Sequence, residues 1–338
     1  MANPQTASLS VADEFVQKIE QKNRKDRIIQ LVPVFVLVGL YLVFAAVAPG
    51  FASLENLITM LGQTALPLTV ALGITFVILT GCIDLSVDGV MSLGGCAVSM
   101  LVMNNMTSLS LGIIGVLASV AVCALIGFCI GLIHVKARIP SFMVSYGFSG
   151  IAAGVAMAVT GAVSPTIMDE GFRNLALSNF LGIPYTAWIS FAVFAVAYIM
   201  QEYTAFGRYL FAVGNDESIP KVIGVNTQTV KLKAFAWSGA LIGLAGVLGA
   251  ARIGMGTTLI GKNNLFPAMT AVVLGGTSLS GGKGGVLNTL LGVLIVTELN
   301  NGLVLLGVSS DLQTGIQSLI ILAAVALSSV RGRRVVSK

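Results

Sequence analysis

The sequence predicts an all-α membrane protein whose helices cross the bilayer many times. Of its 338 residues, 56% are hydrophobic and only 10% are charged, and the mean hydropathy is +0.93. One water-soluble core could not enclose that much apolar surface, so lipid must surround much of the chain. In hydrocarbon every backbone amide and carbonyl needs an internal partner, and the long apolar segments lack the period-two alternation of barrel strands. Helices are therefore the predicted spanning elements.

Ten segments are candidates for these spans, because a helix needs roughly 20 apolar residues to cross about 30 Å of hydrocarbon. In chain order they are 28–48, 65–80, 86–104, 110–134, 140–160, 184–201, 233–252, 264–280, 285–305 and 312–330. The second, sixth and eighth are short for a full crossing. The predicted membrane domain is thus 28–330, between an N-terminal segment 1–27 and a C-terminal tail 331–338.

The basic residues predict which segments face the cytoplasm, since Lys and Arg collect on that side. With the N-terminus inside, all 19 basic residues fall on inner segments except Arg173, Arg252 and Lys262. Both termini are then cytoplasmic. Segment 1–27 is too long and too acidic to begin a cleaved signal peptide, and is either an interfacial helix or a solvated tail. The net charge of +5 reflects topology, so nucleic-acid binding is a poor explanation of it.

Neither a metal centre nor an enzyme active site is predicted. Cys82, Cys96, Cys123 and Cys129 lie in or beside apolar spans without a CxxC pair, and His134 is the only histidine. A zinc site needs about four well-placed ligands, and a Cys–His dyad would have to use the histidine at the inner membrane edge. We interpret the cysteines as small buried hydrophobic residues and the histidine as interfacial. No cofactor is expected.

Acidic residues in the apolar region are expected to have a structural or functional role, because burying one at a helix centre costs about 2.5–3.5 kcal/mol. Asp84 and Asp88 lie at a predicted inner turn between the second and third spans. Either Asp84 or Ser86 caps the next helix there, or the turn contributes to a gate or substrate path. Glu298 and Asn301 in the ninth span are the other candidates for a polar lining, with a hydrogen bond to a neighbouring helix as the alternative.

A glycine-rich segment, 275–285, separates the eighth and ninth spans and invites confusion with a phosphate-binding loop. That loop requires Gly, four residues, Gly, Lys and then Ser or Thr, but Thr277 and Gly284 occupy the first and last of these positions. We therefore predict a tight turn that brings Lys283 to the inner surface. Close helix contacts are also predicted at two pairs of glycines, Gly127 with Gly131 and Gly239 with Gly243.

The longest predicted inner loop, 201–233, is polar and carries both signs of charge. Pro220 suits the first turn of a short helix and Gly224 its end. Most connectors are about 4–6 residues long, and this one is much longer. We expect a short helix that lies under the membrane domain and transmits force from a docked protein, rather than a simple connector.

Four sequence blocks, in the same order, resemble the permease subunits of bacterial ABC importers for ribose, galactose, xylose and related sugars or autoinducer-2. They are 81–89, 206–226, 271–284 and 300–310. The resemblance extends from about Arg27 to the C-terminus. It implies a membrane domain similar to that of the vitamin B12 type of importer, located in the bacterial inner membrane. It also implies a second permease chain, two ATP-binding subunits below, and a solute-binding protein outside.

The resemblance implies roles for individual residues. It places the inner gate at the turn after the second span, and it makes 214–226 the coupling helix that docks on the ATPase. The candidates for the gate or pathway are Asp84, Leu85, Ser86, Asp88, Glu298 and Asn301. The candidates for ATPase coupling are Arg208, Gly214, Asn215, Glu217, Lys221 and Gly224. The chain departs from the family where Cys82 and Asp88 replace glycine, and where Pro267 stands in place of Asp.

We expect a transport subunit that catalyses no covalent chemistry. ATP binding on the partner would rock the helices between outward-open and inward-open states. The expected cargo is a small polar solute, a monosaccharide, with a nucleoside or another small metabolite as the alternative. The main rival is an ion-coupled secondary transporter, which would need a relay of membrane carboxylates and often has inverted repeats. The sequence shows few such carboxylates and no clear duplication.

Overall fold

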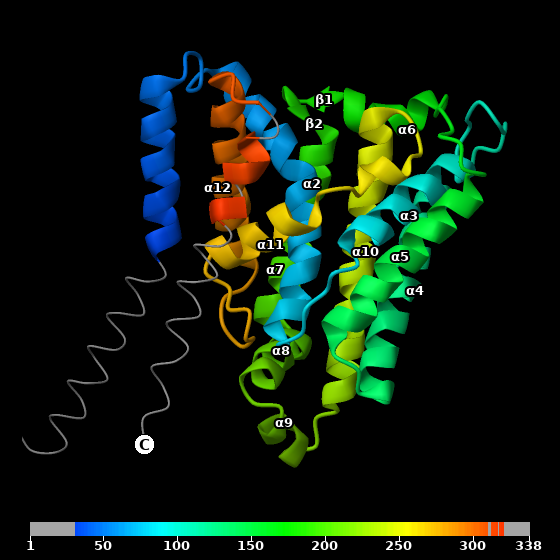
Figure 1. Ribbon diagram of the computed structural model, residues 1–338, viewed down its shortest axis with the longest axis vertical. Coiled ribbons are helices and arrows are strands. Elements are labelled where there is room, and N and C mark those ends of the chain that lie inside the picture. The colour runs from blue at the N-terminus through cyan, green and yellow to red at the C-terminus, as the bar shows by residue number, and fades with distance from the viewer. Residues whose placement is uncertain (1–30, 310–311, 317, 321–338) are drawn as a thin grey trace, which may run out of the picture.

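The computed structural model describes residues 31–309, 312–316 and 318–320 as a bundle of helices that run mostly along one axis (Figure 1). The segments 1–27 and 331–338 and most of the tenth predicted span lie outside the described residues. The first described helix is Leu31–Val47. The elements that follow are α2 Leu54–Leu79, α3 Val87–Leu101, α4 Ile113–Ala137, α5 Ser141–Val159, α6 Glu170–Leu177, β1 Asn179–Phe180, β2 Ile183–Pro184, α7 Tyr185–Tyr203, α8 Ala205–Asn215, α9 Ser218–Val222, α10 Thr227–Ile253, the 3₁₀ helix η1 Thr258–Ile260, α11 Leu265–Leu274 and α12 Val286–Leu305.

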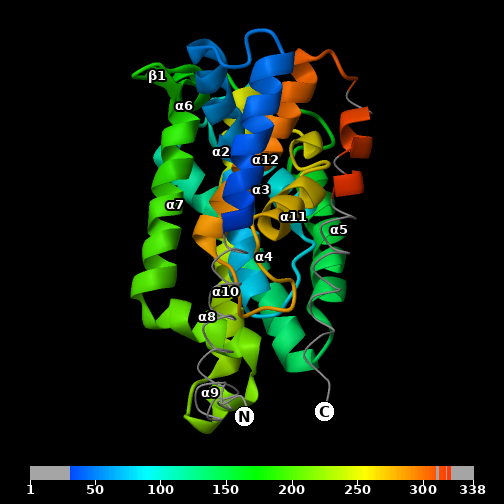
Figure 2. The ribbon, with the colours of Figure 1, turned by 90° about the vertical axis from the view of Figure 1, so that its left-hand side faces the viewer.

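Five of the described helices are long and apolar enough to cross a bilayer, namely α2, α4, α5, α10 and α12. A sixth span would combine α7 with α8, but the chain bends by 71° between them, as Figure 2 shows at the lower end of α7. The helix Leu31–Val47 and α3 are apolar but shorter. The described residues therefore confirm a helical protein with several candidate spans, but not the number ten. They also contain one short antiparallel pair, β1 with β2, that the all-α prediction omits.

α2 is longer than the second predicted span because its polar outer turns find partners. It begins at Leu54, where Ser53 caps it by accepting a hydrogen bond from the amide of Asn56. The Asn56 side chain in turn donates to Asn301 on α12, at 2.9 Å. This contact with α12 provides a partner for a polar side chain in the first turns of α2. Hydropathy does not register such partners, so it places the start of α2 at residue 65 instead of Leu54.

α11 is shorter than the eighth predicted span, 264–280. It holds ten residues, which correspond to about 15 Å, so it cannot cross the membrane as a helix. The glycine segment ends it immediately, because Gly276, Gly281, Gly282 and Gly284 all adopt the positive φ that other residues avoid. The prediction of a tight glycine turn is therefore confirmed, and the prediction of a span is wrong.

α10 is the centre of the fold and packs against α2, α3 and α4. Of its most apolar stretch 78% is buried, against 22% for α5, whose outer face is open. Glycines permit the close crossing of α10 and α4. A Cβ atom on Gly127 would collide with the backbone oxygen of Phe235, and one on Gly239 with that of Cys123. The predicted close glycine contacts between helices are confirmed.

The order of long helix, irregular segment, short helix and long helix occurs twice in the chain. It is seen in α2, α3 and α4, and again in α10, α11 and α12. The two copies are inverted, since Gly73 of α2 packs near Ser238 of α10 while Leu66 lies near Gly249, which makes α2 and α10 antiparallel. The duplication that the sequence does not show is therefore visible in the backbone, so the lack of a repeat no longer argues against a secondary transporter.

Candidate functional site

After a turn at Thr80 and Gly81, residues 82–85 form an extended segment inside the bundle rather than a turn at its edge. Figure 1 shows this segment rising from the lower end of α2 to α3. Asp84 contacts Ser238, which lies eleven residues, or roughly 16 Å, beyond the first residue of α10. The predicted position of Asp84 and Asp88 at an inner turn is therefore wrong, because both lie well inside the bundle.

Three serines of α5 satisfy the backbone of this extended segment and of α3. They accept hydrogen bonds from the amides of Ile83, Leu85 and Gly89 at 2.9, 2.9 and 3.1 Å. The serines, spaced four residues apart on one face of α5, are Ser141, Ser145 and Ser149. An unpaired amide in hydrocarbon costs several kcal/mol, so this serine ladder allows the segment to stay extended. Sequence reasoning missed it, although the spacing of the serines was visible.

Asp84 fixes the start of α3 to α10. Its Oδ1 accepts hydrogen bonds from the amide and the hydroxyl of Ser86, at 2.9 and 2.6 Å, and its Oδ2 accepts one from the hydroxyl of Ser238 at 2.9 Å. The carboxyl group is almost wholly buried. Ser86 is the N-cap residue of α3, but its side chain makes no capping bond because it donates to Asp84. Leu85 lies half-buried between the two.

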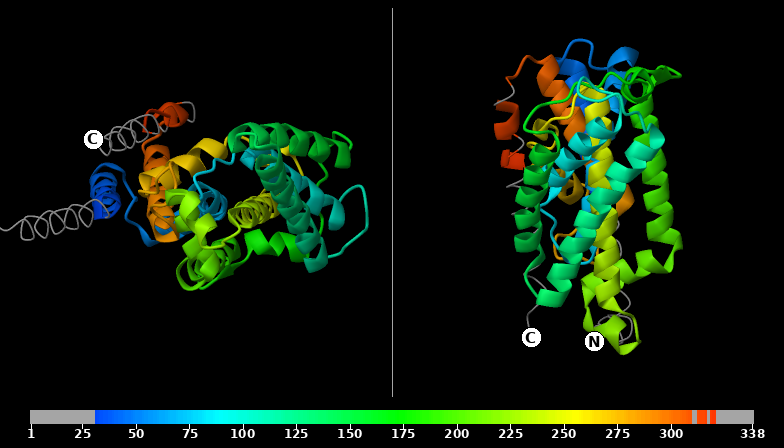
Figure 3. Two further views of the ribbon diagram at one scale, coloured as in Figure 1. Left: turned by 90° about the horizontal axis from the view of Figure 1, so that it is seen from below. Right: turned by 90° about the vertical axis from the view of Figure 1, so that its right-hand side faces the viewer.

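A pocket lined by both polar and apolar residues opens beside the start of α3. Its volume is about 430 Å³, and α3, α5 and the segment around η1 form its walls. The lining residues are Asp88, Gly89, Ser92, Tyr146, Ser149, Gly150, Ala153, Thr258, Leu259 and Lys262. Its volume lies in the usual range for sites that bind small molecules. Figure 3 shows in its right-hand view that α4 and α5 form an antiparallel pair.

The two candidates on α12 lie elsewhere. Asn301 accepts the Asn56 bond described above and donates to Gln63 at 3.4 Å, so it joins α12 to α2. Glu298 is 2% exposed, and its Oε2 has no hydrogen-bond partner among the residues that the structure describes. Neither residue lines the pocket beside α5. A role for them in a pathway stays a prediction.

The segment 201–233 is largely helical, with α8 and α9 between the end of α7 and the first turns of α10. α9 forms the lowest point of the described chain in Figures 1 and 2. Three of its apolar side chains are exposed, with fractions of 63% for Ile219, 87% for Val222 and 73% for Ile223 just beyond the helix. Sequence reasoning missed these three residues. The sequence feature that could have identified them is the presence of apolar side chains in an otherwise polar segment.

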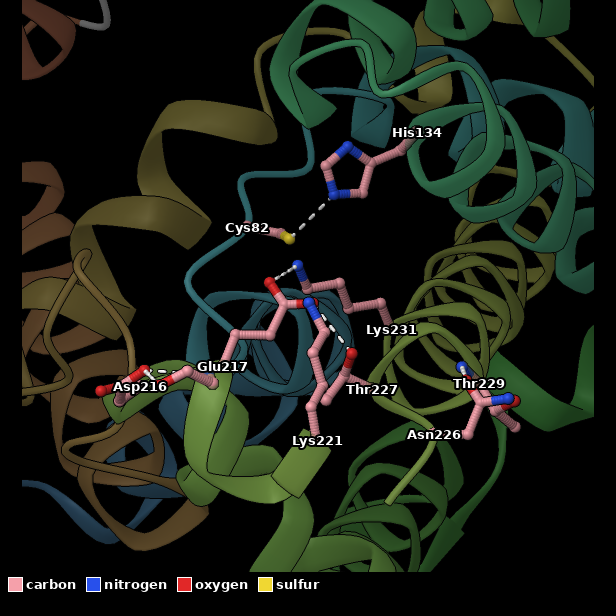
Figure 4. A network of polar contacts seen from close by, with 10 residues as sticks. Cys82, His134, Asp216, Glu217, Lys221, Asn226, Thr227, Thr229 and Lys231 are labelled. Atoms are coloured by element: carbon pink, nitrogen blue, oxygen red, sulfur yellow. Dashed lines mark hydrogen bonds and ion pairs between the residues drawn. The ribbon is translucent and has the colours of Figure 1, made fainter. Parts of the chain in front are cut away.

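Glu217 holds α9 against α10, as the dashed contacts in Figure 4 show. Its carboxylate forms ion pairs with Lys221 at 3.0 Å and Lys231 at 2.8 Å, and accepts a hydrogen bond from Thr227 at 2.9 Å. Partial burial by itself raises the pKa of Glu217, but the bonds from Lys231, Lys221 and Thr227 outweigh it and lower the pKa to about 2. The charged groups of Glu217 and Lys221, which were predicted to contact the ATPase, therefore already have partners within this chain.

We expect Glu217→Gln to lower the stability of the α9–α10 junction by about 1 kcal/mol at neutral pH, since the group is partly exposed. Because the pKa of Glu217 falls from 4.5 to about 2 on folding, its contribution is complete above pH 4.5 and disappears as the pH falls through 2. Hydrogen exchange of α9 and α10 in parent and variant at pH 7 and at lower pH measures this. A difference that grows on acidification contradicts the ion-pair assignment.

The other coupling candidates divide into two groups. Gly214 and Asn215 contact other parts of the chain: a Cβ on Gly214 would collide with the carbonyl oxygen of Leu79, and the exposed side-chain amide of Asn215 donates to the carbonyl oxygen of Gly282 at 3.2 Å. The ends of α2 and α8 and the glycine turn therefore meet at one junction, although they are far apart in sequence. Arg208 and Gly224 are exposed, and Gly224 ends the α9 turn with a φ of +82°.

Cys82 and His134 form a polar pair that the sequence did not predict. The Cys82 sulfur lies 3.4 Å from Nε2 of His134, whose Nδ1 is 2.7 Å from the carbonyl oxygen of Ile139. The prediction of buried cysteines is confirmed for Cys82, Cys96 and Cys123 but is wrong for Cys129, which is only half-buried, and the Cys82 thiol also has a polar partner. Among the described residues, no group of three or more His, Cys, Asp or Glu is arranged to hold a metal ion.

Helices that break inside a bundle, a pocket with several polar side chains beside them and exposed apolar side chains at one end are typical of a membrane transport subunit. Residues 56–325 match the family described as branched-chain amino acid transport system / permease component. The chain belongs to this family. It is therefore a multi-pass inner-membrane permease and not an enzyme, and an ABC importer of this kind also has ATP-binding subunits and a solute-binding protein.

Several characterised relatives share most of their length with this chain. The ribose import permease protein RbsC of Escherichia coli (strain K12) is 36% identical over 300 residues, which cover 87% of this chain and 91% of that protein. RbsC of Bacillus subtilis (strain 168) is 33% identical over 317 residues, or 93% and 97% of the two chains. The autoinducer 2 import system permease protein LsrC of Salmonella typhi is 30% identical over 306 residues, or 90% and 85%. No solved structure matches the chain significantly.

Proposed function

We propose that this chain is the permease of an ATP-driven importer for a monosaccharide, and that the pocket beside α5 is its half of the substrate pathway. The names of the relatives support a sugar or a sugar-derived signal as cargo, with ribose as the first choice. The observation that carries the pathway proposal is the pocket itself. It contains polar side chains beside apolar surface, lies where α3 begins within the bundle, and borders α5, whose most apolar stretch is only 22% buried by the described residues.

A second permease chain packing on α5 would close the pocket and complete the pathway. The exposed apolar side chains of α5 support this, because they need either lipid or another helix. We further propose a fold similar to the membrane domain of the vitamin B12 type of importer, surrounded by lipid, in which α11 enters the bilayer without crossing it. Both termini and α9 then lie in the cytoplasm. The distribution of Lys and Arg supports this orientation.

The transport cycle would begin at α9. A motion of the ATP-binding subunits displaces this helix, and Glu217 passes the displacement to Thr227 and Lys231 of α10. α10 carries Ser238, which is bonded to Asp84 at the start of α3. This route connects the ATP-binding subunits to the wall of the pocket through hydrogen bonds and one rigid helix. If this linkage moves between two positions, it would produce the outward-open and inward-open states that alternating access requires.

We expect Gly150→Trp to block import at least tenfold while the protein still folds. Gly150 is exposed on α5, lines the pocket, and has no atom near the position of an added Cβ, so the indole projects into the proposed pathway. Gly39→Trp is the matched control, because Gly39 is equally open but lies on the helix Leu31–Val47. The measurement is ribose uptake by vesicles that contain the complete importer. Normal uptake by Gly150→Trp contradicts the pathway assignment.

The cargo alternatives are separated by a different measurement. A solute-binding protein that recognises a nucleoside and not ribose would favour the nucleoside importer, with the permease mechanism unchanged. Uptake that continues without ATP and without the ATP-binding subunits would favour the secondary transporter. Membership of the permease family argues against that second alternative.

A further inference from the structure

Cys82 and His134 have the arrangement of an activated thiol, and the proposed transport cycle uses neither of them. Nδ1 of His134 lies 2.7 Å from the carbonyl oxygen of Ile139, which can only accept a hydrogen bond, so Nδ1 carries a hydrogen. The other ring nitrogen, Nε2, can then accept the proton of the Cys82 thiol, whose sulfur lies 3.4 Å away. A nucleophile, a base and a group that orients the base are therefore present together.

Two positive groups stabilise the thiolate, which is the reactive form of a cysteine. A proton transferred to His134 leaves the sulfur beside an imidazolium cation. Figure 4 shows Lys231, which pairs with Glu217, beside the same pair, and its ammonium group interacts electrostatically with the sulfur. Cys123 lacks this setting, because its thiol donates to the carbonyl oxygen of Val90 at 3.5 Å, and a carbonyl oxygen does not act as a base.

The sulfur also lies where four segments of the chain meet. Cys82 follows the end of α2, and the preceding Gly81 packs on the glycine turn, since a Cβ on Gly281 would lie 2.7 Å from the amide nitrogen of Gly81. The ring of His134, on α4, contacts that of Phe235 on α10, with ring centroids 6.1 Å apart. Because Cys82 is only 5% exposed, a group attached to its sulfur would have to separate these segments.

We propose that Cys82 is a modification site that forms a mixed disulfide with small disulfides such as glutathione disulfide, and that the modified permease no longer imports. His134 accepts the thiol proton, and the Cys82 sulfur attacks one sulfur of the disulfide. The S–S bond of the reagent breaks and a new S–S bond joins one half of it to Cys82. The other half leaves as a thiolate and takes the proton from His134. One sulfur is oxidised and one is reduced, so no further reactant is needed.

The inference rests on the proposed function in one respect. The reagent must reach a sulfur that is covered in this structure, and the helix movements of the transport cycle would open the end of the bundle next to α9. The inference goes beyond that function by assigning a chemical reaction to a thiol and by naming the class of compound that reacts with it.

Three variants separate the reactivity of the thiol from its exposure. Cys82→Ala removes the sulfur, and His134→Gln removes the base but keeps a side-chain amide that can donate to the Ile139 carbonyl oxygen. Cys129→Ala is the matched control, because it removes the most exposed of the four thiols and lies on the same helix as His134. If exposure alone decided reactivity, Cys129 would react first.

The first measurement is the mass of the permease, and of its peptides, after the complete importer is treated with glutathione disulfide at pH 7. We expect one added glutathionyl group on Cys82 in the parent and in Cys129→Ala, none in Cys82→Ala, and addition at least about tenfold slower in His134→Gln. The rate for His134→Gln should also rise more steeply with pH, up to the ordinary thiol pKa of about 8.5. Faster addition to Cys129, no addition to Cys82, or equal rates in parent and His134→Gln overturns the proposal.

The second measurement is ribose uptake by vesicles that contain the treated importer. Parent and Cys129→Ala should lose uptake in proportion to the modified fraction and regain it when dithiothreitol reduces the mixed disulfide, whereas Cys82→Ala should import throughout. Undiminished uptake by fully modified parent overturns the proposal. If the untreated parent imports no ribose, the proposed cargo is wrong, and the mass measurement still tests the modification of Cys82.

Discussion

Changing both Val222 and Ile223 to Asp is expected to weaken association with the ATP-binding subunits by about 100-fold or more. These side chains are 87% and 73% exposed at the tip of the described chain, so their apolar area has no partner within it. Burying one such side chain in an interface contributes about 1.5–3 kcal/mol, and each 1.4 kcal/mol is a tenfold change in affinity. Two charges at this position would also have to be desolvated. Association measured with purified subunits tests this expectation.

The matched control is Leu181→Asp. Leu181 is 78% exposed in the turn between β1 and β2, at the opposite end of the bundle from α9 (Figure 1). Leu181→Asp therefore also replaces an exposed apolar side chain by a charged one, but far from the proposed docking surface on α9. We expect normal association for the control and normal membrane insertion for all variants. Undiminished association of the double variant would contradict the assignment of α9 as the coupling helix.

The sequence predicts those parts of the fold that depend on local composition. Apolar stretches identify the long helices, Gly276 to Gly284 identify a turn, and Pro220 with Gly224 identifies the α9 region. It does not predict where helices stop inside the membrane, because hydropathy is the same for a buried half-helix and for a span. The segment 82–85 is extended because α5 supplies acceptors to the amides of Ile83 and Leu85, and that depends on how distant segments pack.

The candidate site shows the same division. The sequence identifies Asp84 and Asp88 as acidic residues in an apolar region, where an unpaired carboxylate would be costly. The structure shows that their hydrogen-bond partners come from residues far along the chain. Ser238 lies 154 residues after Asp84, and Leu265 lies 177 residues after Asp88. No periodicity within one helix connects such pairs. The serines of α5 are different, since a spacing of four residues was sufficient to predict a polar stripe on one helix face.

Asp84→Ala is expected to abolish import and to destabilise the folded permease by about 3 kcal/mol or more. The buried carboxylate accepts three hydrogen bonds, and its removal leaves the Ser86 and Ser238 donors unpaired where water does not reach them. Each unsatisfied buried donor costs about 1–3 kcal/mol. The start of α3 is also released from α10, so motion of α10 no longer reaches the pocket. Uptake, ATP hydrolysis and thermal stability measured on the same preparations test both effects.

Two further variants separate the linkage from general loss of stability. Ser238→Ala removes one of the three bonds and should cost about 1–2 kcal/mol, and adding it to Asp84→Ala should cost little more, because the two residues act as one unit. Both variants leave the exposed surface of α9 unchanged. We therefore expect the ATP-binding subunits still to bind and to hydrolyse ATP while import is lost. If Asp84→Ala imports ribose at the parental rate, motion does not reach the pocket through this bond.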